Sequence, residues 1–227
     1  MARVVRRSVF LLMQVFHRST NVLSRVTIFG GLLIVAASFY LLATVNASPW
    51  VSRQGVAREQ PVQFSHRHHA KELGIDCRYC HTTVEELAYA GMPPTQTCIN
   101  CHAQIWSDSP YLEPVRASWR DEKPIEWTKV YDLPGYVYFD HSAHVTKGVG
   151  CTSCHGNVDE QNVLWQEPSL HMEWCLNCHR EPEKYVRPPS EVFNMDWEPP
   201  ADQLRLGLEL IKLNDIEPRE DCGACHR

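Results

Sequence analysis

The first 47 residues contain no lysine and no acidic residue, although they hold five arginines, at positions 3, 6, 7, 18 and 25. The other 180 residues carry 17 basic residues against 27 acidic ones. A basic N-terminus indicates either contact with nucleic acid or a signal for membrane topology. The acidic remainder argues against a nucleic-acid-binding protein, so the arginines favour topology.

Aliphatic residues are scarce after the first 45 residues, where proline, histidine, cysteine and tryptophan become frequent. A sheet or helix bundle of this length needs an extended core of valine, isoleucine and leucine. The composition therefore argues against a conventional core in this part of the chain. It indicates that something other than aliphatic side chains fills the interior.

Residues 26–45 have no charged side chain over 20 consecutive positions, which is the length that a helix needs to cross a bilayer. By the positive-inside rule, the preceding arginines place the N-terminus in the cytoplasm. The alternative is a cleaved signal peptide, because Val45-Asn46-Ala47 resembles a small-residue cleavage site. The apolar run is longer than a usual signal core, so we expect an uncleaved transmembrane helix.

Four segments follow from this prediction. We expect a cytoplasmic or interfacial segment at 1–25, with 8–16 along the membrane surface, a transmembrane helix at 26–45, a linker at 46–63 and a further domain at 64–227.

No cysteine precedes residue 77, and all ten cysteines fall into five copies of C-x-x-C-H. This is the attachment sequence of c-type haem, in which two thiols bond to the porphyrin and the adjacent histidine binds the iron. The predicted attachment residues are Cys77, Cys80, Cys98, Cys101, Cys151, Cys154, Cys175, Cys178, Cys222 and Cys225. The predicted proximal ligands are His81, His102, His155, His179 and His226.

Two other uses of ten cysteines are disulfides and zinc sites. A disulfide framework does not require a histidine after every second cysteine. Tetrahedral zinc sites need paired C-x-x-C units, and five units do not pair. We therefore predict five covalently bound haems, attached on the periplasmic or outer side of the membrane.

The haems also predict the fold class, because about 36 residues per haem cannot build a core of their own. We expect a mainly α and irregular domain, with loops and short helices packed round five porphyrins. Apolar residues at 204, 208 and 211 predict one longer helix over 200–213.

The phrase F-x-H-x-x-H occurs twice, at 64–69 and at 139–144, and each copy precedes two haem motifs. This repeat predicts two duplicated di-haem units, 64–102 and 139–179, with a fifth haem appended at 222–226. Two histidines three residues apart share a helix face but point to slightly different places, so they can serve two irons. The predicted distal ligands are His66, His69, His141 and His144.

The same phrase resembles the multihaem cytochromes of the c3 and c7 type. That resemblance implies that His66 serves the haem at Cys77 and Cys80, and that His141 serves the haem at Cys151 and Cys154. It also implies that the second histidine of each phrase serves a different haem.

Four distal histidines leave one iron without a sixth ligand, and the candidates are His68, His171, Met92, Met172 and Met195. The stretch M-x-W-C-x-x-C-H-R at 172–180 and the stretch G-M-P-P-T at 91–95 resemble the pentahaem cytochrome subunits of bacterial alternative complex III. That resemblance implies four bis-histidine haems and one histidine–methionine haem, with Met172 as the ligand. His171 is the next candidate.

The resemblance further implies an electron-transfer subunit without catalytic residues of its own, which carries electrons from a quinol-oxidising membrane complex to a cytochrome c or another periplasmic acceptor. The implied partners are polytopic quinol-binding subunits, an iron–sulfur subunit and a mono-haem cytochrome c.

Two alternatives remain open. One is a stand-alone, membrane-anchored quinol dehydrogenase, which usually has a methionine where this chain has Thr83. The other is a multihaem reductase, which needs an open iron position and often a C-x-x-C-K motif that this sequence lacks.

Overall fold

The computed structural model describes residues 16–226 and divides into two units, with the boundary between Val51 and Ser52. The segment predicted to lie along the membrane, 8–16, falls almost entirely outside the described residues, as does the greater part of 1–25.

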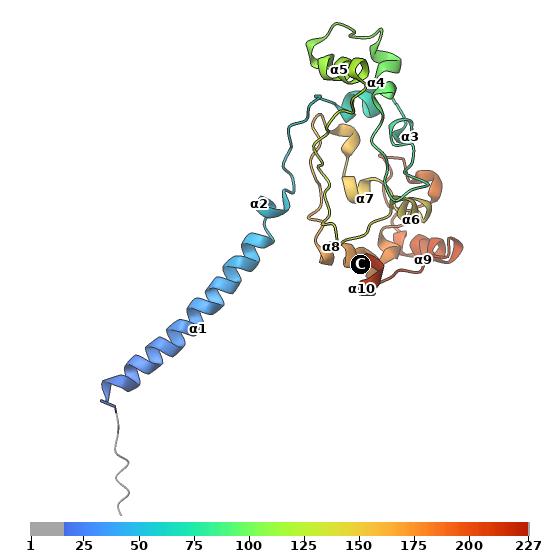
Figure 1. The fold of residues 1–227 in the computed structure, drawn as a ribbon. Coiled ribbons are helices and arrows are strands. Elements are labelled where there is room, and N and C mark those ends of the chain that lie inside the picture. Colours follow the sequence, from blue (N-terminus) through green and yellow to red (C-terminus); the bar gives the residue numbers. More distant parts are fainter. Residues whose placement is uncertain (1–15, 227) are drawn as a thin grey trace, which may run out of the picture. The chain divides into compact units, whose positions relative to one another are not determined.

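The first unit is one long apolar helix, α1 (Ser19–Asn46), followed by the short α2 (Pro49–Ser52) (Figure 1). Helix α1 contains the predicted span and begins seven residues earlier. Its hydroxyl groups bond to its own backbone, as Ser24 Oγ donates to Thr20 O at 2.6 Å. No side chain of α1 is buried, and its mean hydropathy of 2.2 is high enough for a bilayer. A signal sequence near an N-terminus has the same properties.

The second unit consists of short helices joined by irregular chain. Its α-helices are α3 (Cys77–Cys80), α4 (Thr95–His102), α5 (Glu113–Asp121), α6 (His141–Thr146), α7 (Thr152–His155), α8 (Met172–Arg180), α9 (Gln203–Leu213) and α10 (Cys222–Cys225). A π-helical segment covers Arg67–Glu72, and 3-10 turns cover Pro110–Leu112, Val158–Glu160, Pro182–Lys184 and Pro189–Glu191.

Between residues 16 and 226 there is no β-strand, only three isolated bridges, at Gln54–Gln166, Val137–His226 and Val149–Val186. The predicted mainly α and irregular class is therefore confirmed. The predicted long helix at 200–213 is present as α9 and begins three residues later, because Gln203 N first closes a turn onto Pro200 O at 3.0 Å.

The helices of the second unit follow one another from end to end. Helices α4 and α5 lie at one end, α3 and α7 lie in the middle, and α8, α9 and α10 lie at the other end (Figure 1).

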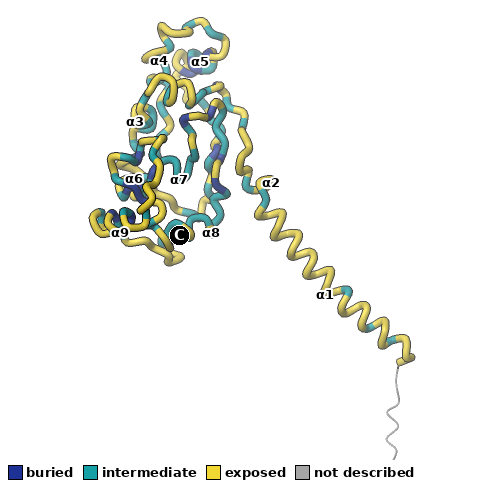
Figure 2. Tube along the Cα trace, turned by 180° about the vertical axis from the view of Figure 1, so that it is seen from behind, coloured by how far each residue is buried: buried dark blue, intermediate teal, exposed yellow. Residues whose placement is uncertain are grey.

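The aliphatic core of this unit is small. Only nine apolar side chains of the described residues are buried, each of them valine or leucine, and the largest fully buried ones are Val186 and Val192. They form separate small patches along the chain rather than one interior (Figure 2). A unit of this length would ordinarily bury many more apolar side chains, so the interior has room for another large apolar group.

Glycine permits the turn before the first and third haem motifs. Gly74 and Gly148 have φ angles of 66° and 88°, in the left-handed region that other residues rarely adopt. At Gly148 a side chain would also collide with the backbone of Arg187, whose N–H donates to Gly148 O at 2.8 Å. This glycine therefore joins the third haem motif to the segment around Arg187.

Candidate haem-binding centres

Four of the five predicted proximal histidines are oriented by the same kind of hydrogen bond. In each case Nδ1 donates to a backbone carbonyl: His81 to Gly91 at 2.7 Å, His102 to Ile105 at 3.0 Å, His179 to Arg219 at 2.8 Å and, more weakly, His226 to Tyr136 at 3.4 Å. A metal-binding histidine typically uses one ring nitrogen in this way and binds the metal with the other. The arrangement leaves Nε2 available in all four.

His155 differs from the other four. None of the described residues hydrogen-bonds to its ring, which packs instead against the ring of Tyr131 with 4.3 Å between centroids. Tyr131 is held by its hydroxyl, which accepts from Glu167 N at 3.0 Å and donates to Trp165 O at 3.3 Å.

The two F-x-H-x-x-H segments have nearly the same internal geometry. The phenylalanine ring meets the first histidine edge-on at 4.9 Å in both copies, and it stacks on the second histidine at 4.5 Å in both. Nδ1 of the second histidine donates to the carbonyl four residues earlier, from His69 to Ser65 at 2.9 Å and from His144 to Asp140 at 2.7 Å. The phenylalanine thus fixes the angle of both rings.

The first histidines of the two copies differ at Nδ1. Nδ1 of His141 donates to Ala88 O at 2.8 Å, so this ring is tied to the loop after the first haem motif. Nδ1 of His66 is buried and has no hydrogen-bond partner. The first copy is also π-helical where the second is α-helical.

The structure brings three predicted distal histidines close to proximal ones, with interplanar angles of 62°, 15° and 59°. The ring centroids of His69 and His102 are 6.2 Å apart, those of His141 and His155 are 6.5 Å apart, and those of His144 and His179 are 6.0 Å apart. His66 lies close enough to His81 for the two to interact electrostatically.

These distances fit a haem iron between the two rings. A bond of about 2 Å from metal to imidazole nitrogen on each side, with the ring centroid about 1 Å beyond the nitrogen, separates the centroids by about 6 Å. The free Nε2 atoms and the small aliphatic core agree with the same group. The residues present therefore fit c-type haem.

The electrostatics keep key histidines in the neutral form that binds metal. Burial, with a contribution from His81, lowers the pKa of His66 to about 4. Burial likewise lowers the pKa of His155 to about 4, with a contribution from His141. Protons therefore compete little for these nitrogens at neutral pH.

The surroundings of the cysteines bear on the other uses considered. None of the ten, all within the described residues, forms a disulfide. Burial raises the pKa of Cys154 to about 12 and that of Cys151 to about 11, which disfavours the thiolate that a zinc site needs. Nowhere between residues 16 and 226 do three or more His, Cys, Asp or Glu side chains gather as ligands for a bare metal ion.

The proximity of cysteines from different motifs gives the spatial order of the five motifs. Cys80 lies near Cys98, Cys77 near Cys151, Cys154 near Cys175 and Cys178, and Cys175 near Cys225. The motifs thus follow the order second, first, third, fourth, fifth. Figure 1 shows the same succession of helices, from α4 through α3 and α7 to α8 and α10.

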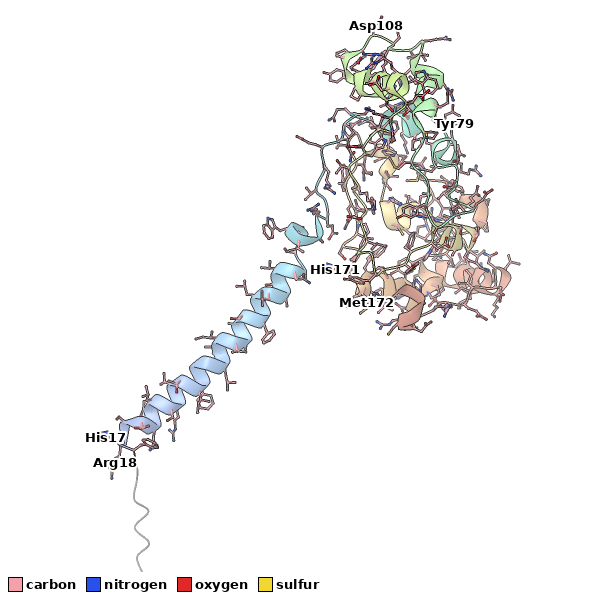
Figure 3. All side chains as sticks on the ribbon, in the orientation of Figure 1. His17, Arg18, Tyr79, Asp108, His171 and Met172 are labelled. Carbon is pink, nitrogen blue, oxygen red and sulfur yellow. The ribbon has the colours of Figure 1, made fainter. Side chains whose placement is uncertain are left out.

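For His226 the structure supplies no facing histidine among the described residues. Its neighbouring ring is that of Tyr136, at 5.9 Å. His171 and Met172 lie at the start of α8, at the end of the unit that also carries α10 (Figure 3). Met172 is 64% exposed, whereas His68 bonds to Glu72 at 3.0 Å at an exposed site. The prediction that Met172 is the fifth distal ligand stays a prediction.

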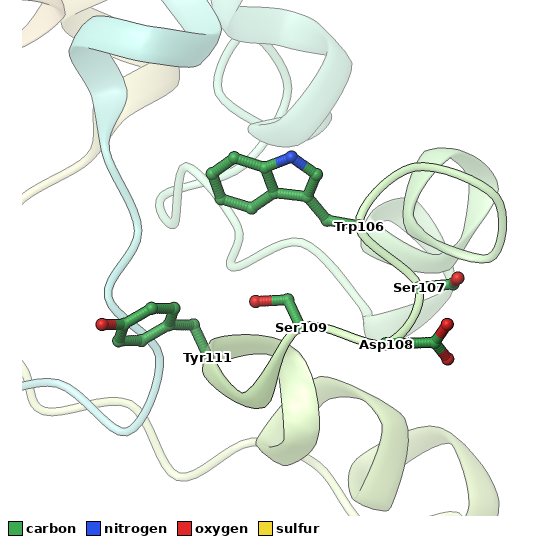
Figure 4. Close-up of a pocket in the computed structure, with 5 residues that line it drawn as sticks. All are labelled: Trp106, Ser107, Asp108, Ser109 and Tyr111. Carbon is green, nitrogen blue, oxygen red and sulfur yellow. The ribbon is translucent and has the colours of Figure 1, made fainter.

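A shallow hollow beside α4 is lined by Trp106, Ser107, Asp108, Ser109 and Tyr111. Trp106 and Tyr111 face each other across it with Ser109 between them, while Ser107 and Asp108 point away (Figure 4). This lining offers neither a nucleophile next to a base nor a set of metal ligands, so it does not form a catalytic site.

Several residues that shape these centres had no predicted role. Phe64 and Phe139 were visible as part of the repeat, but their packing on the histidines was not. The backbone carbonyls that orient the imidazoles, and Arg187, gave no sequence signal, because their positions depend on loops from distant parts of the chain.

Comparison with known proteins agrees with these centres. Residues 43–125 match the class III cytochrome c family, and residues 137–227 match the family of cytochrome c7 and related cytochromes c. The chain is also 33% identical over 138 residues to a protein of Nitratidesulfovibrio vulgaris described as the multihaem cytochrome c subunit of a menaquinone reductase. The matched segment is 60% of this chain and 59% of that relative. Two segments that together make up most of the haem-motif region are therefore similar to multihaem cytochromes c of the class III and c7 type, and this similarity, with the five C-x-x-C-H motifs, indicates covalently bound c-type haems.

Proposed function

We propose that this chain is a membrane-anchored pentahaem cytochrome that relays electrons within a quinone-linked respiratory complex. The observation that supports this best is the series of imidazole pairs that follow one another along the second unit. Each pair would occupy both axial positions of its iron and leave none vacant for a substrate. Each haem, when bound, exchanges one electron between its ferric and ferrous forms.

Four haems take two histidines each in this proposal. The pairs are His66 with His81, His69 with His102, His141 with His155, and His144 with His179. Met172 is the sixth ligand of the fifth haem, opposite His226. Closed coordination of this kind suits electron transfer rather than a reductase, because a substrate needs a vacant position on the iron.

The route runs through the haems in the order of their motifs in space: second, first, third, fourth and fifth. Each His-x-x-His segment links two neighbouring haems, since its two rings belong to different pairs. The two halves of the route are joined at His141, whose backbone N–H and Nδ1 both bond to Ala88 O, at 3.1 and 2.8 Å. The first and third haems are thereby held side by side.

Helix α1 serves as a single-pass anchor, with the N-terminus in the cytoplasm and the haem unit on the periplasmic side. Its length and composition, the arginines before it and the similarity to a subunit of a menaquinone reductase support this. N-terminal sequencing of the mature protein should find residues 26–45 retained. A mature chain beginning at or near Ser48 would show that α1 is a cleaved signal.

The direction of electron flow has two candidates. The resemblance to alternative complex III favours oxidation of quinol and delivery to a downstream cytochrome c. The relative in a menaquinone reductase favours the opposite direction, toward reduction of menaquinone. In both cases the partners are polytopic quinone-binding subunits, an iron–sulfur subunit and, for quinol oxidation, a mono-haem cytochrome c.

Kinetics on the purified membrane complex test the proposal. Mixing the oxidised complex with menaquinol, and the reduced complex with menaquinone, should change the haem absorbance in at least one direction, and the faster direction identifies the physiological one. Complex purified without this chain is the control. The proposal fails if neither quinone species exchanges electrons with the haems, or if the isolated chain turns over nitrite or sulfite.

A further inference from the structure

Arg187 is a buried arginine beside the third haem motif. It is 4% exposed, although arginine usually keeps its charged group in water. Its backbone bonds to Gly148, and its guanidinium lies against Gly150, where any side chain would collide with it. Helix α9 holds this segment in place, since Gln203 Nε2 donates to Val186 O at 2.8 Å.

The partners of this guanidinium are neutral. Its NH2 group donates to Thr152 Oγ1 at 2.6 Å, and NH1 donates to Asn194 O at 3.2 Å and to Glu191 O at 3.4 Å. Nε has no partner, and the ring of Trp197 lies 4.3 Å from the guanidinium carbon.

No carboxylate among the described residues forms an ion pair with this charge. The carboxylate of Glu191 is near enough to act on Arg187 electrostatically, but it accepts its hydrogen bond from Asn194 Nδ2 at 2.7 Å. An arginine stays charged at any ordinary pH. Burying such a charge without an ion partner costs folding free energy. A functional role for the charge would account for its position.

The charge lies at the attachment edge of one haem. Thr152 stands between Cys151 and Cys154, the two residues that bond to the third porphyrin. A porphyrin carries its propionates on the edge opposite to these bonds, so the propionates of that haem are far from Arg187. The propionates of that haem therefore provide no ion partner for Arg187 when the haem is bound.

We propose that Arg187 raises the reduction potential of the haem attached at Cys151 and Cys154 above the potentials of the other bis-histidine haems. The ferric state has one more positive charge than the ferrous state, so a buried cation beside it destabilises the ferric form. The proposal rests on a haem at this motif and on the bis-histidine ligation proposed above, but not on which complex the chain serves.

The ligand His155 acts in the same direction. A hydrogen bond from Nδ1 to a carbonyl makes an imidazole more electron-donating and so favours the ferric iron. The other four proximal histidines have such a bond, whereas none of the described residues accepts one from His155. The third motif stands at the middle of the route. Because its haem has a raised reduction potential, it would hold an electron longer than its neighbours do.

The decisive variant keeps Arg187 and places a negative charge beside its guanidinium. Thr152→Asp places a carboxylate at the NH2 group of Arg187, and Thr152→Asn is the uncharged control of the same shape. Spectroelectrochemical titration of the purified holoprotein, at unchanged haem content, should show one of five midpoint potentials shifted downward in Thr152→Asp and none shifted in Thr152→Asn. When Thr152→Asp is combined with His141→Ala, the downward shift should appear at the haem that the loss of His141 has made high-spin.

Substitution of Arg187 provides a second comparison. Arg187→Gln should lower the same midpoint, and Arg187→Lys should retain it because the charge is kept. The proposal is overturned if Thr152→Asp leaves all five midpoints in place, or if Thr152→Asn shifts the midpoint as far as Thr152→Asp does. If Arg187→Gln does not fold, Thr152→Asp and Thr152→Asn still test the proposal, because both variants keep the arginine.

Discussion

Histidines that are close neighbours in this chain have different environments. His66 is buried, His68 is exposed and bonded to Glu72, and the ring of His69 is stacked on Phe64 and faces His102. The turn of the chain and the ring of Phe64 thus give these three histidines, which lie within four positions, different environments. Their chemistry follows from which nitrogen is free, which composition does not reveal.

His69→Ala should open one haem and leave the others closed. Without its distal imidazole, the haem at Cys98 and Cys101 should become high-spin and bind carbon monoxide. His68→Ala is the matched control, because this neighbouring histidine points to solvent and should leave every haem low-spin. Absorbance and electron paramagnetic resonance spectra of both variants report the spin states. High-spin haem in the His68 variant, or none in the His69 variant, would contradict the assignment.

Met172→His should lower one midpoint potential and keep all haems low-spin. Imidazole stabilises ferric iron more than a thioether does, and axial ligands tune haem potentials over a range of about 0.8 V, so a shift on the order of 0.1 V is expected. Redox titration measures it, and Met195→His serves as the control at another methionine. If every potential stays in place, Met172 is a packing residue and His171 or His68 becomes the candidate ligand.

The His-x-x-His segment is the element that sets the spacing between haems. In helix α6, Asp140 caps the N-terminus by accepting from Ala143 N at 3.3 Å, and Phe139 packs on both ligand rings. The three-residue spacing turns the two rings toward different proximal partners, His155 and His179. A six-residue helix can therefore align two porphyrins, because Asp140 fixes its N-terminus and Phe139 fixes its ligand rings.

Insertion of one alanine after Ser142 should disconnect the fourth haem. An added residue rotates the rest of a helix by about 100°, so His144 would no longer face His179, while His141 would keep its partner. One haem should become high-spin, and electron transfer across α6 should slow. Ser142→Ala changes the same position without changing the spacing and should leave the spectra as they are. Two haems lost, or none, would argue against a shared ligand helix.

At the scale of the whole molecule, the haems take the place of the missing core. The nine buried valines and leucines of the described residues are too few to stabilise a unit of this length, which begins at Ser52. Ten unpaired cysteines and the separate aliphatic patches are distributed along that whole length. Covalent porphyrins would supply the apolar surface that the sequence itself lacks.

Intact-mass analysis of the purified chain should therefore find five haems and no disulfide. Each C-x-x-C-H motif should contribute one covalent haem, and reduction should release no free thiol. A chain in which the cysteines of one motif are replaced by alanine should lose one haem mass, which provides the calibration. Fewer than five haem masses in the unaltered chain, or any disulfide, would contradict the stoichiometry.

The sequence alone determined the fold class and the apolar helix, and it predicted the haem attachment and the ligand pairs. Each depends on local spacing: C-x-x-C-H for haem, F-x-H-x-x-H for paired ligands and 20 uncharged residues for α1. The pairing of His69 with His102 and of His144 with His179 required the tertiary structure, since these rings meet across loops of more than 30 residues. The same holds for the order of the motifs in space and for Arg187 beside Thr152. Contacts between distant segments depend on how the whole chain folds around its haems. The spacing of neighbouring residues does not determine such contacts.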